Sequence, residues 1–484
     1  MSEEREKEHQ KDGQNENDVK KTEPPENKTD KQIDIETPNS GQRIKLIVSI
    51  AWPALAENFL TSIMSMVGMI MVGGLGAYAI AAVGLVTQPR FLMMAAFTAM
   101  NVGTTALVAQ SKGARNPDGA NNALNQSIML NLGLTAIICI IMTIFSEQLI
   151  RMLAGSEISE QTVQESIRYL RIQIYGFPAT SLTFTMNAAL RGAGNTRATF
   201  YNNTVANIVN VALAYCLING HFGFPRMEVA GASLALVIAQ SVGLLMALRV
   251  LLEGKQYIRL RFGKFWKIDT SMMKRISRIG LPSFAEQALM RIGAMWFVTI
   301  VTSLGDLAYA AHMVTMNIQQ LAFTTGMAFG VAATTLVGQT IGRARTDLTR
   351  VYVRVIQTMG FVVSVLIAIV MFTMGQPIAG LYSNDAVIIA LAADMLKIIA
   401  IVNPIMNARF IYSHALYGAG DAKFMAVVTG VGVLMVRPLV GLLLVNVFHM
   451  GLTGVWIALS SDLSVSWLIT WIRYKKGKWA LIKI

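Results

Sequence analysis

The amino-acid sequence predicts an all-α polytopic membrane protein with twelve transmembrane helices in two six-helix bundles related by a parallel internal repeat. Two observations support this fold class. The chain of 484 residues is 54% hydrophobic and only 14% charged, with a mean hydropathy of +0.49, whereas soluble domains carry about a quarter charged residues. Its apolar part also occurs twice, and duplication in a multi-span membrane protein is typical of transporters.

The duplication is visible in short motifs that recur at a nearly constant spacing. The sequence Pro53-Ala-Leu-Ala-Glu57 recurs 229 residues later as Pro282-Ser-Phe-Ala-Glu286, and the glycine-rich sequence 190–195 recurs 226 residues later as 416–421. Each half must therefore hold the same number of helices. Six helices per half is an even number, so both halves share one orientation and are related by an axis along the membrane normal.

Apolar runs place these helices along the chain, because a helix needs about 20 apolar residues to cross a bilayer. In the first half the predicted spans are 44–72, 79–110, 121–145, 163–190, 198–219 and 229–252; in the second half they are 274–303, 309–339, 351–375, 386–416, 424–447 and 452–473. The first helix of each half carries the repeated Pro and Glu, the second ends at a Gln-x-x-Gly turn, and the fourth ends at the glycine-rich turn. These shared landmarks justify the count of six in each half.

Five segments follow from these spans: residues 1–43 as a disordered charged cytoplasmic tail, 44–252 as an N-terminal six-helix bundle, 253–273 as a basic cytoplasmic linker, 274–473 as a C-terminal six-helix bundle and 474–484 as a cytoplasmic C-terminal tail. The N-terminal tail holds 12 of the 28 acidic and 8 of the 41 basic residues, and so polar a segment cannot bury enough apolar surface to fold. The linker interleaves aromatic and basic residues, which beside a membrane favours binding to anionic lipid headgroups.

The remaining charge is distributed as a topology signal. Residues 44–484 carry 33 basic and 16 acidic residues, a net charge of +17, and the Lys and Arg residues gather in alternate loops. This asymmetry predicts a multi-pass protein of the cell membrane with both termini in the cytoplasm. Because the excess of Lys and Arg residues lies in short loops between apolar spans, it does not indicate nucleic-acid binding. No apolar stretch precedes residue 46, so we expect no cleavable signal peptide.

Several classes of chemistry lack the residues that they need. The two cysteines, Cys139 and Cys216, lie in apolar runs without metal-ligand spacing. The glycine-rich turns lack the Gly-Lys-Ser/Thr ending of a phosphate-binding loop. Because no catalytic cluster is visible either, we expect neither an enzyme nor a bound cofactor.

Taken together, the paired motifs resemble those of the multidrug and toxic compound extrusion (MATE) family of efflux transporters, bacterial type. The resemblance rests on the Val-Gly-x-Leu-Gly stretch at 72–76, the turns 110–113 and 339–342, and the glycine-rich turns 190–196 and 416–421, in register from about residue 44 to 473. It implies two six-helix bundles in a V shape that export organic, often cationic, compounds. It also implies that Na⁺ or H⁺ flowing in the opposite direction drives export.

The sequence departs from the family pattern at two positions. Many members carry an Asp late in the first helix, where this chain has Gly68. Others carry an acid in the tenth helix, near 407–409 here, but no acid lies between Asp394 and Asp421. A mechanism that uses either carboxylate is therefore not carried over, and the coupling ion stays open between Na⁺ and H⁺.

Glu57 and Glu286 are the leading candidates for ion coupling. Each lies about 13 residues into its helix, or about 20 Å, near the middle of the bilayer, where charged side chains mark functional sites. Each follows a Pro by one turn, and Pro frees a backbone carbonyl, so either Glu could bind Na⁺; desolvation could instead let the carboxyl carry a proton. The alternative is a structural Glu that is hydrogen-bonded to Asn58, Gln287 or Ser283.

Further polar residues complete the predicted site. Arg291 lies five residues after Glu286, either as its ion-pair partner or as a charge that repels cationic cargo. Arg437 lies mid-span in the eleventh helix, and its first-half counterparts, Asn207 and Asn210, suggest that the two bundles handle ions differently. The alternatives are an Arg that bonds backbone carbonyls and locks its bundle, and Asn residues that merely join helices. Arg409 and Asp462 are buried charges for which the sequence suggests no partner.

These observations favour a secondary antiporter that exports amphiphilic or cationic organic compounds, such as drugs and toxins, in exchange for Na⁺ or H⁺ by alternating access. Its expected partners are a small-molecule substrate, the coupling ion and membrane lipids, and a monomer is expected. The alternative is a flippase for a lipid-linked precursor, or an exporter of one specific metabolite. A receptor or an embedded enzyme would not need one acid in each half.

Overall fold

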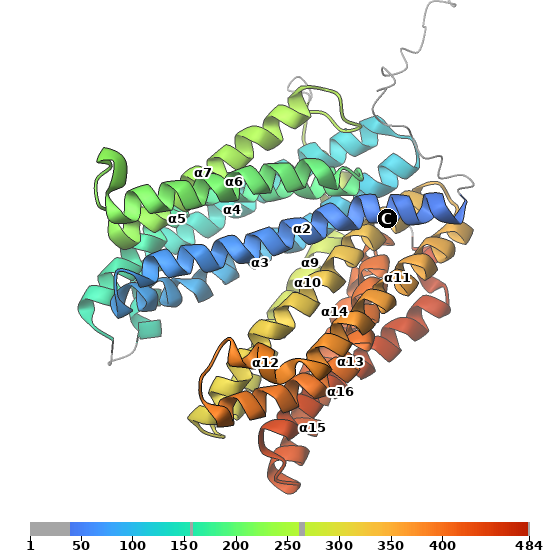
Figure 1. Ribbon diagram of the computed structural model, residues 1–484. Coiled ribbons are helices and arrows are strands. Elements are labelled where there is room, and N and C mark those ends of the chain that lie inside the picture. Colours follow the sequence, from blue (N-terminus) through green and yellow to red (C-terminus); the bar gives the residue numbers. More distant parts are fainter. Residues whose placement is uncertain (1–38, 155–157, 261–266, 483–484) are drawn as a thin grey trace, which may run out of the picture. The chain divides into compact units, whose positions relative to one another are not determined.

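The computed structural model describes residues 39–154, 158–260 and 267–482, and Arg43–Ile484 form one compact unit. Every regular element among the described residues is helical, which confirms the all-α fold class (Figure 1). The predicted tail at residues 1–43 lies almost entirely outside the described residues. Residues 261–266 of the predicted linker and the last two residues of the C-terminal tail also lie outside them.

Six long helices arise from the first half of the sequence, at the places that the apolar runs predict. They are α2 (Ser40–Gly73), α3 (Ala77–Gly113), α4 (Pro117–Ala154), α5 (Glu160–Gly192), α6 (Thr196–Asn219) and α7 (Glu228–Leu252). A short helix, η1 (His221–Gly223), follows α6. We call this group the first bundle.

The second half repeats the pattern. Its helices are α9 (Thr270–Thr302), α10 (Asp306–Gly342), α11 (Thr346–Thr373), α13 (Ala386–Gly418), α14 (Ala422–Gly430) and α16 (Gly451–Lys475). Helix α14 continues as the π-helical η2 (Val431–Val436), α15 (Arg437–Leu442) and the π-helical η3 (Leu443–Val447), which together make one long helix. Two short elements, α12 (Gly375–Gly380) and η4 (Lys478–Leu481), were not predicted from the sequence.

Ten helices of the described residues are long and apolar enough to cross a membrane. The other two long helices are α5 and α6, which have 33 and 24 residues. Both carry Asn and Thr side chains that bond inside the first bundle, and α5 also carries Arg191, which bonds to Glu57; such residues lower the hydropathy of both helices. Their identification as spans therefore depends on the repeat, which requires six helices in each half.

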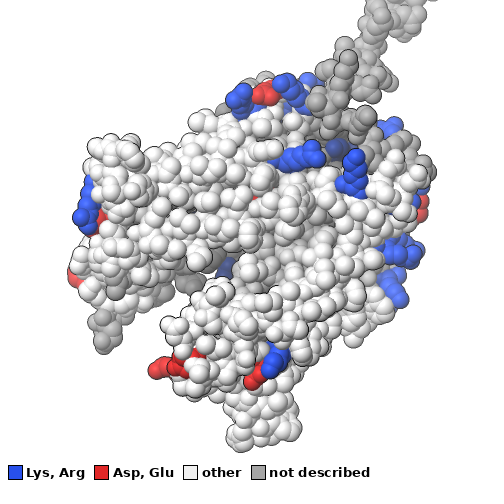
Figure 2. Space-filling model, in the orientation of Figure 1, with Lys and Arg blue, Asp and Glu red and all other residues white. Residues whose placement is uncertain are grey.

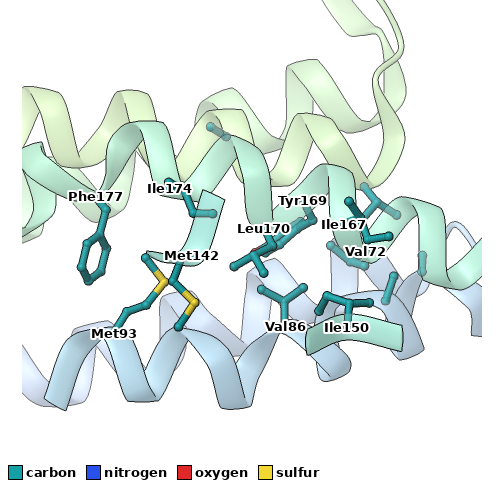
Figure 3. Packing of buried hydrophobic residues seen from close by; sticks show 14 of the residues in the cluster. Val72, Val86, Met93, Met142, Ile150, Ile167, Tyr169, Leu170, Ile174 and Phe177 are labelled. Carbon is teal, nitrogen blue, oxygen red and sulfur yellow. The ribbon is translucent and has the colours of Figure 1, made fainter. Parts of the chain in front are cut away.

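Each bundle has its own apolar core. In the first bundle, the close view shows Val86 of α3, Ile150 of α4 and Leu170 of α5 near one another, and Phe177 of α5 further along the same core on the side of Met93 (Figure 3). In the second bundle, the fully buried Trp456 of α16 belongs to a core that α10 and α13 complete. Separate cores are what two bundles need if one is to move against the other.

A third apolar cluster joins the two bundles at one end. Leu107 of α3, Ile258 of the linker and Ile276 of α9 are all buried in it. We call this the closed end, because α3 and α10 finish and approach each other here, whereas the opposite ends of the bundles diverge (Figure 1). The surface is hollowed between the diverging open ends (Figure 2).

Candidate functional site

The closed end is held by α3 and α10, which cross at their last residues. A Cβ atom at Gly113 would overlap the backbone of Gln339, and one at Gly342 would overlap the backbone of Gln110. The two contacts are reciprocal, since Gln110 and Gly113 are the repeat equivalents of Gln339 and Gly342. Only glycine lets the helices approach so closely, so the Gln-x-x-Gly motif permits this crossing.

The same glutamines reach the glycine-rich turns of the opposite bundle. Gln110 Nε2 donates to the carbonyl oxygen of Gly418 at 3.0 Å, and Gln339 Nε2 donates to the carbonyl oxygen of Gly192 at 3.3 Å. Each turn is therefore held by a side chain of the other bundle. The two repeated motifs have a common structural role, which is to close this end of the molecule.

Glu57 lies on α2 and forms a charged network with α5 and α6. Its Oε1 accepts from Asn203 Nδ2 at 2.5 Å and from Arg191 Nη1 at 3.4 Å, and its Oε2 accepts from Thr199 Oγ1 at 3.1 Å. The contact with Arg191 is also an ion pair. The charge of this carboxylate is thus balanced by a guanidinium at the end of α5.

A row of Asn side chains extends the network. Asn203 Oδ1 accepts from Asn187 Nδ2 at 3.1 Å, and Asn187 Oδ1 accepts from Asn202 Nδ2 at 3.2 Å. One turn further along α2, Thr61 Oγ1 accepts from Asn207 Nδ2 at 3.2 Å. Because each Asn offers both a donor and an acceptor, the row orients the amide that faces the carboxylate.

Glu286 lies on α9 and is buried in a network of different chemistry. Its Oε2 accepts a hydrogen bond from the Tyr417 hydroxyl at the end of α13, and its Oε1 accepts from Thr429 Oγ1 of α14 at 2.9 Å. Arg409 donates to Thr429 Oγ1, at 3.4 Å. Among the described residues, Glu286 therefore has hydroxyl partners and no ion-pair partner.

The two networks occupy equivalent positions of the repeat. Arg191 and Tyr417 are 226 residues apart, and so are Asn203 and Thr429. In each half, one partner of the Glu comes from the end of the fourth helix and another from the fifth. The geometry is retained while the chemistry differs, with a guanidinium and an amide in the first bundle and two hydroxyls in the second.

Arg291 does not pair with Glu286 in the structure, although the sequence suggested that it could. Its guanidinium lies over the ring of Phe91 on α3, 4.3 Å from the ring centroid. Five residues place two side chains about 140° apart around an α-helix, so Arg291 and Glu286 point from different faces of α9. Arg291 instead connects the two bundles through a cation–π contact.

Three other predicted residues lie beside the networks. In the part of the chain that the structure describes, no hydrogen bond joins Asn58 to Glu57 or Gln287 to Glu286. Asn210 is partly buried on α6, one turn beyond the Asn row. The partners of both carboxylates thus come from other helices and not from the residues next to them in sequence.

The backbone beside Pro53 is already bonded. Proline cannot donate to the carbonyl four residues before it, which here is that of Ser49, and this oxygen accepts from Thr196 Oγ1 at 3.4 Å. Within the described residues, no three His, Cys, Asp or Glu side chains gather as a metal site would require. The structure therefore offers the carboxylates themselves as the sites at which a coupling ion could act.

Arg437 forms an ion pair with Asp462 of α16. Its Nη2 and Nε donate to Asp462 Oδ2 at 2.5 and 3.1 Å, and Ser466 Oγ donates to Oδ1 at 3.1 Å. The two charged side chains are 11% and 4% exposed. The guanidinium also lies 5.6 Å from the ring centroid of Phe297. The second bundle thus contains a buried ion pair in addition to Glu286.

Sequence reasoning missed most of these partners. Thr199 and Thr429 come from helices other than those of the groups they contact, and no local pattern singles them out. Asp462 was predicted to be a buried charge, but its pairing with Arg437 was not. The repeat could have identified two other partners, Arg191 and Tyr417, because they align in the repeated turns and each contacts the Glu of its own half. That signal was present in the sequence but was interpreted only as a turn motif.

The comparisons with known proteins agree with this architecture. The MatE family model matches residues 53–216 and 282–443, once in each half. A Thermotoga maritima protein named "Probable multidrug resistance protein NorM" is 28% identical over 438 residues, which cover 90% of this chain and 93% of the relative. A Bacillus subtilis protein named "Probable multidrug resistance protein YoeA" is 25% identical over 428 residues, which cover 87% and 91%.

Solved structures share the fold. A multidrug resistance MATE family transporter described in an outward-facing conformation superposes with a TM-score of 0.84 at 22% identity, covering 91% of this chain and 97% of its own. A MATE crystal structure in a bent conformation gives a TM-score of 0.83 at 22% identity, covering 90% and 96%. With the family model matched across both halves, the chain belongs to the MatE family of multidrug and toxic compound extrusion (MATE) efflux transporters.

Proposed function

We propose that this protein is a secondary antiporter that exports amphiphilic or cationic organic compounds in exchange for H⁺ or Na⁺ by alternating access. The names of the NorM and YoeA relatives support a multidrug cargo. The separate cores, the closed end and the hollow between the open ends support two bundles that rock about their crossing (Figure 2). The coupling ion is carried through the protein, and no cofactor is needed.

The observation that carries the coupling mechanism is the difference between the two repeat-related carboxylates. Glu57 has Arg191 as a counter-ion, whereas Glu286 is buried among the hydroxyls of Tyr417 and Thr429. A buried carboxylate without a cation is costly in a membrane protein, and one monovalent cation would remove that cost. We therefore assign ion coupling to Glu286 and a structural role to Glu57.

The donors around Glu286 favour H⁺ over Na⁺. Both of its oxygens already accept hydroxyl donors, and a proton can join such a network without displacing them. Na⁺ prefers several oxygen ligands that point lone pairs at it. The carbonyl freed by Pro53 at the equivalent place in the first bundle is taken by Thr196, so the Pro–Glu pairing does not supply that ligand there.

Exposed methionines on the first helix of each bundle give a surface suited to cargo of varied shape. On α2, no residue between Ala54 and Val72 is buried, and Met66, Met69 and Met295 are all exposed. Methionine is flexible and polarizable, and adapts to differently shaped apolar ligands. Such a surface can bind the apolar part of an amphiphilic compound, while the charge of the compound is recognised by other groups.

The distribution of charge supports a plasma-membrane location with both termini in the cytoplasm. Lys and Arg gather around the closed end in the view shown, while the middle of the bundles is largely uncharged (Figure 2). By the positive-inside rule the closed end then faces the cytoplasm, and the hollow opens outward. We propose a monomer that contacts anionic lipids at this basic end.

Efflux of ethidium tests the proposal. Cells that lack other pumps are loaded with the dye, and wild type is compared with Glu286→Gln under imposed H⁺ or Na⁺ gradients. Asp394→Asn is the matched control, because Asp394 is an exposed carboxylate paired with Lys397 at 2.9 Å. Wild type and control are expected to export the dye when the H⁺ gradient is present, and Glu286→Gln is expected to reach the membrane but not to export.

Each other outcome has a distinct meaning. Efflux driven by the Na⁺ gradient would support the antiporter function and identify Na⁺, in place of H⁺, as the coupling ion. Gradient-driven efflux by Glu286→Gln at the wild-type rate would remove Glu286 from the coupling mechanism. A wild type that exports no dye under either gradient would favour the alternative cargo, a lipid-linked precursor or one specific metabolite.

A further inference from the structure

A second carboxylate lies in the interior of the second bundle, and the coupling scheme above does not use it. Asp462 of α16 accepts both donors of Arg437 on one oxygen and the Ser466 hydroxyl on the other. It is only 3% exposed. An ionisable pair at membrane depth is a functional candidate by default, and this one needs an explanation beyond stability, because buried ion pairs add little stability over apolar residues.

The helix that carries Arg437 has an irregular backbone on both sides of it. Residues of η2 precede Arg437 and residues of η3 follow α15, and both segments are π-helical. Pro438, the next residue, has no backbone N–H and disturbs the α-helical ladder. Segments of π-helix are frequent at functional sites. Arg437 thus lies on a part of the helix where the backbone hydrogen bonds change between the π-helical and the α-helical pattern.

The pair lies between Glu286 and the open end. Thr429, which donates to Glu286, precedes Arg437 by eight residues on one continuous helix that runs outward from the closed end. Eight residues correspond to about 12 Å along an α-helix. Gly432 lies between these two levels, and a Cβ atom there would overlap Asp462 Oδ1, so Asp462 packs against the same stretch of helix. An ion that reaches Glu286 from the open side must pass the level of Asp462.

The surroundings of Asp462 contain one direct counter-ion. The other titratable groups on the helices packed against α16 include Glu286 and Arg291 of α9 and Arg409 and His414 of α13. His312 of α10 lies between the rings of Phe297 and Trp456 in tilted contacts, with centroids 5.5 and 5.4 Å apart. None of them bonds to Asp462 in the described part of the chain. Within the described residues, Arg437 is the one ion-pair partner of this carboxylate, so protonation of Asp462 would release Arg437.

We propose that Asp462 is a second coupling residue, which takes up the incoming proton at the open side and passes it through water to Glu286. Uptake forms one O–H bond on Asp462 and breaks its ion pair with Arg437. Transfer breaks that O–H bond, forms one on Glu286 and restores the ion pair, while water only relays the proton. The inference rests on the proposed function, since it assigns a route to the same coupling proton.

Purified full-length protein in proteoliposomes tests this route. Ethidium accumulation driven by an imposed pH difference is measured from pH 5 to 9, alongside equilibrium ethidium binding. Asp462→Asn is expected to bind the dye as wild type does, but to lose the dependence of the transport rate on the pH difference. Asp462→Glu is expected to restore part of that dependence, and Asp394→Asn is expected to match wild type throughout.

The result that overturns the proposal is an Asp462→Asn variant that transports with the wild-type pH profile, because the pair would then be only a structural lock. If Asp462→Asn fails to fold, the double variant Arg437→Met/Asp462→Leu removes both charges, and pH-driven transport by that variant overturns the proposal equally. A wild type that shows no pH-driven transport refutes H⁺ as the coupling ion of the proposed function, whereas a wild type that shows it and an Asp462→Asn variant with the same pH profile refute only the route through Asp462.

Discussion

Three ion pairs of graded burial give a direct test of the assigned networks. The carboxylates of Asp394, Glu57 and Asp462 are 62%, 12% and 4% exposed, and each pairs with one Lys or Arg. Exposed pairs contribute about 0–1 kcal/mol, whereas removal of one partner from a buried pair costs about 3–5 kcal/mol. Neutral substitution should therefore destabilise the protein in the order Asp394→Asn, Glu57→Gln, Asp462→Asn.

The structure sets the expected size of each step. Asp394→Asn should cost at most about 1 kcal/mol. Asp462→Asn leaves a buried guanidinium without its carboxylate, so the full cost of about 3–5 kcal/mol applies. Glu57→Gln falls between, at about 1–3 kcal/mol, because the Arg191 contact is longer, at 3.4 Å, and Arg191 is 22% exposed and can turn to solvent.

Thermal unfolding of the purified protein measures the series. The unfolding entropy of about 2.1 cal/mol/K per residue implies that 1 kcal/mol shifts Tm by about 1 °C in a chain of this size. Asp462→Asn should therefore lower Tm by about 3–5 °C. Equal shifts for Asp462→Asn and Asp394→Asn would refute the assignment of a dry ion pair inside the second bundle.

A double variant separates charge from packing. Arg437→Met/Asp462→Leu removes both charges and keeps apolar volume, and such replacements of buried pairs are often neutral or stabilising. The double variant should thus be more stable than Asp462→Asn alone. A double variant as unstable as the single one would mean that lost space, and not an uncompensated charge, causes the instability.

Three further predictions concern the closed end and its surroundings. Gly342→Ala should disrupt the crossing of α3 and α10 and cost about 1–3 kcal/mol, measured as Tm, while Gly84→Ala, which has open space around it, should be neutral. The pKa of Asp269, the N-cap of α9, is lowered chiefly by a backbone hydrogen bond, so Asp269→Ala should destabilise by about 1 kcal/mol at pH 7. That difference should disappear as the pH falls below the ordinary Asp pKa of about 3.9 and through the lowered pKa of the folded state. Trp479 is buried and donates to a backbone carbonyl of α16, so Trp479→Ala should speed tryptic cleavage of the described C-terminal segment, whereas the exposed Trp52→Ala should not.

The helices were predictable because their signals are local. Twelve spans follow from apolar runs and the repeat, and the polar α5 and α6 are found only through their repeat mates. The short α12 and the π-helical η2 and η3 were not predicted, because small local departures from a regular helix leave little trace in hydropathy. The repeat also correctly placed the Gln-x-x-Gly and glycine-rich motifs at helix ends.

The partners of the charged residues were not predictable in the same way. The pairing of Arg191 with Glu57 spans 134 residues, and that of Arg437 with Asp462 spans 25. Each depends on which faces of two helices meet, and hydropathy does not encode this. The pairing of Arg291 with Glu286, which their proximity in sequence suggested, is absent because five residues separate the side chains by about 140° around the helix.

The repeat itself explains how one protein can hold two chemically different sites. Duplication fixes the backbone geometry twice, so each Glu meets a residue from the fourth helix of its half and another from the fifth. A change of those partner residues alone then decides the role of the carboxylate. Arg191 pairs with Glu57, while Tyr417 occupies the equivalent position beside Glu286, which has no ion-pair partner within the described residues. Of these two repeat-related carboxylates, Glu286 responds to the gradient in the proposed function, while Glu57 holds the helices of its bundle together.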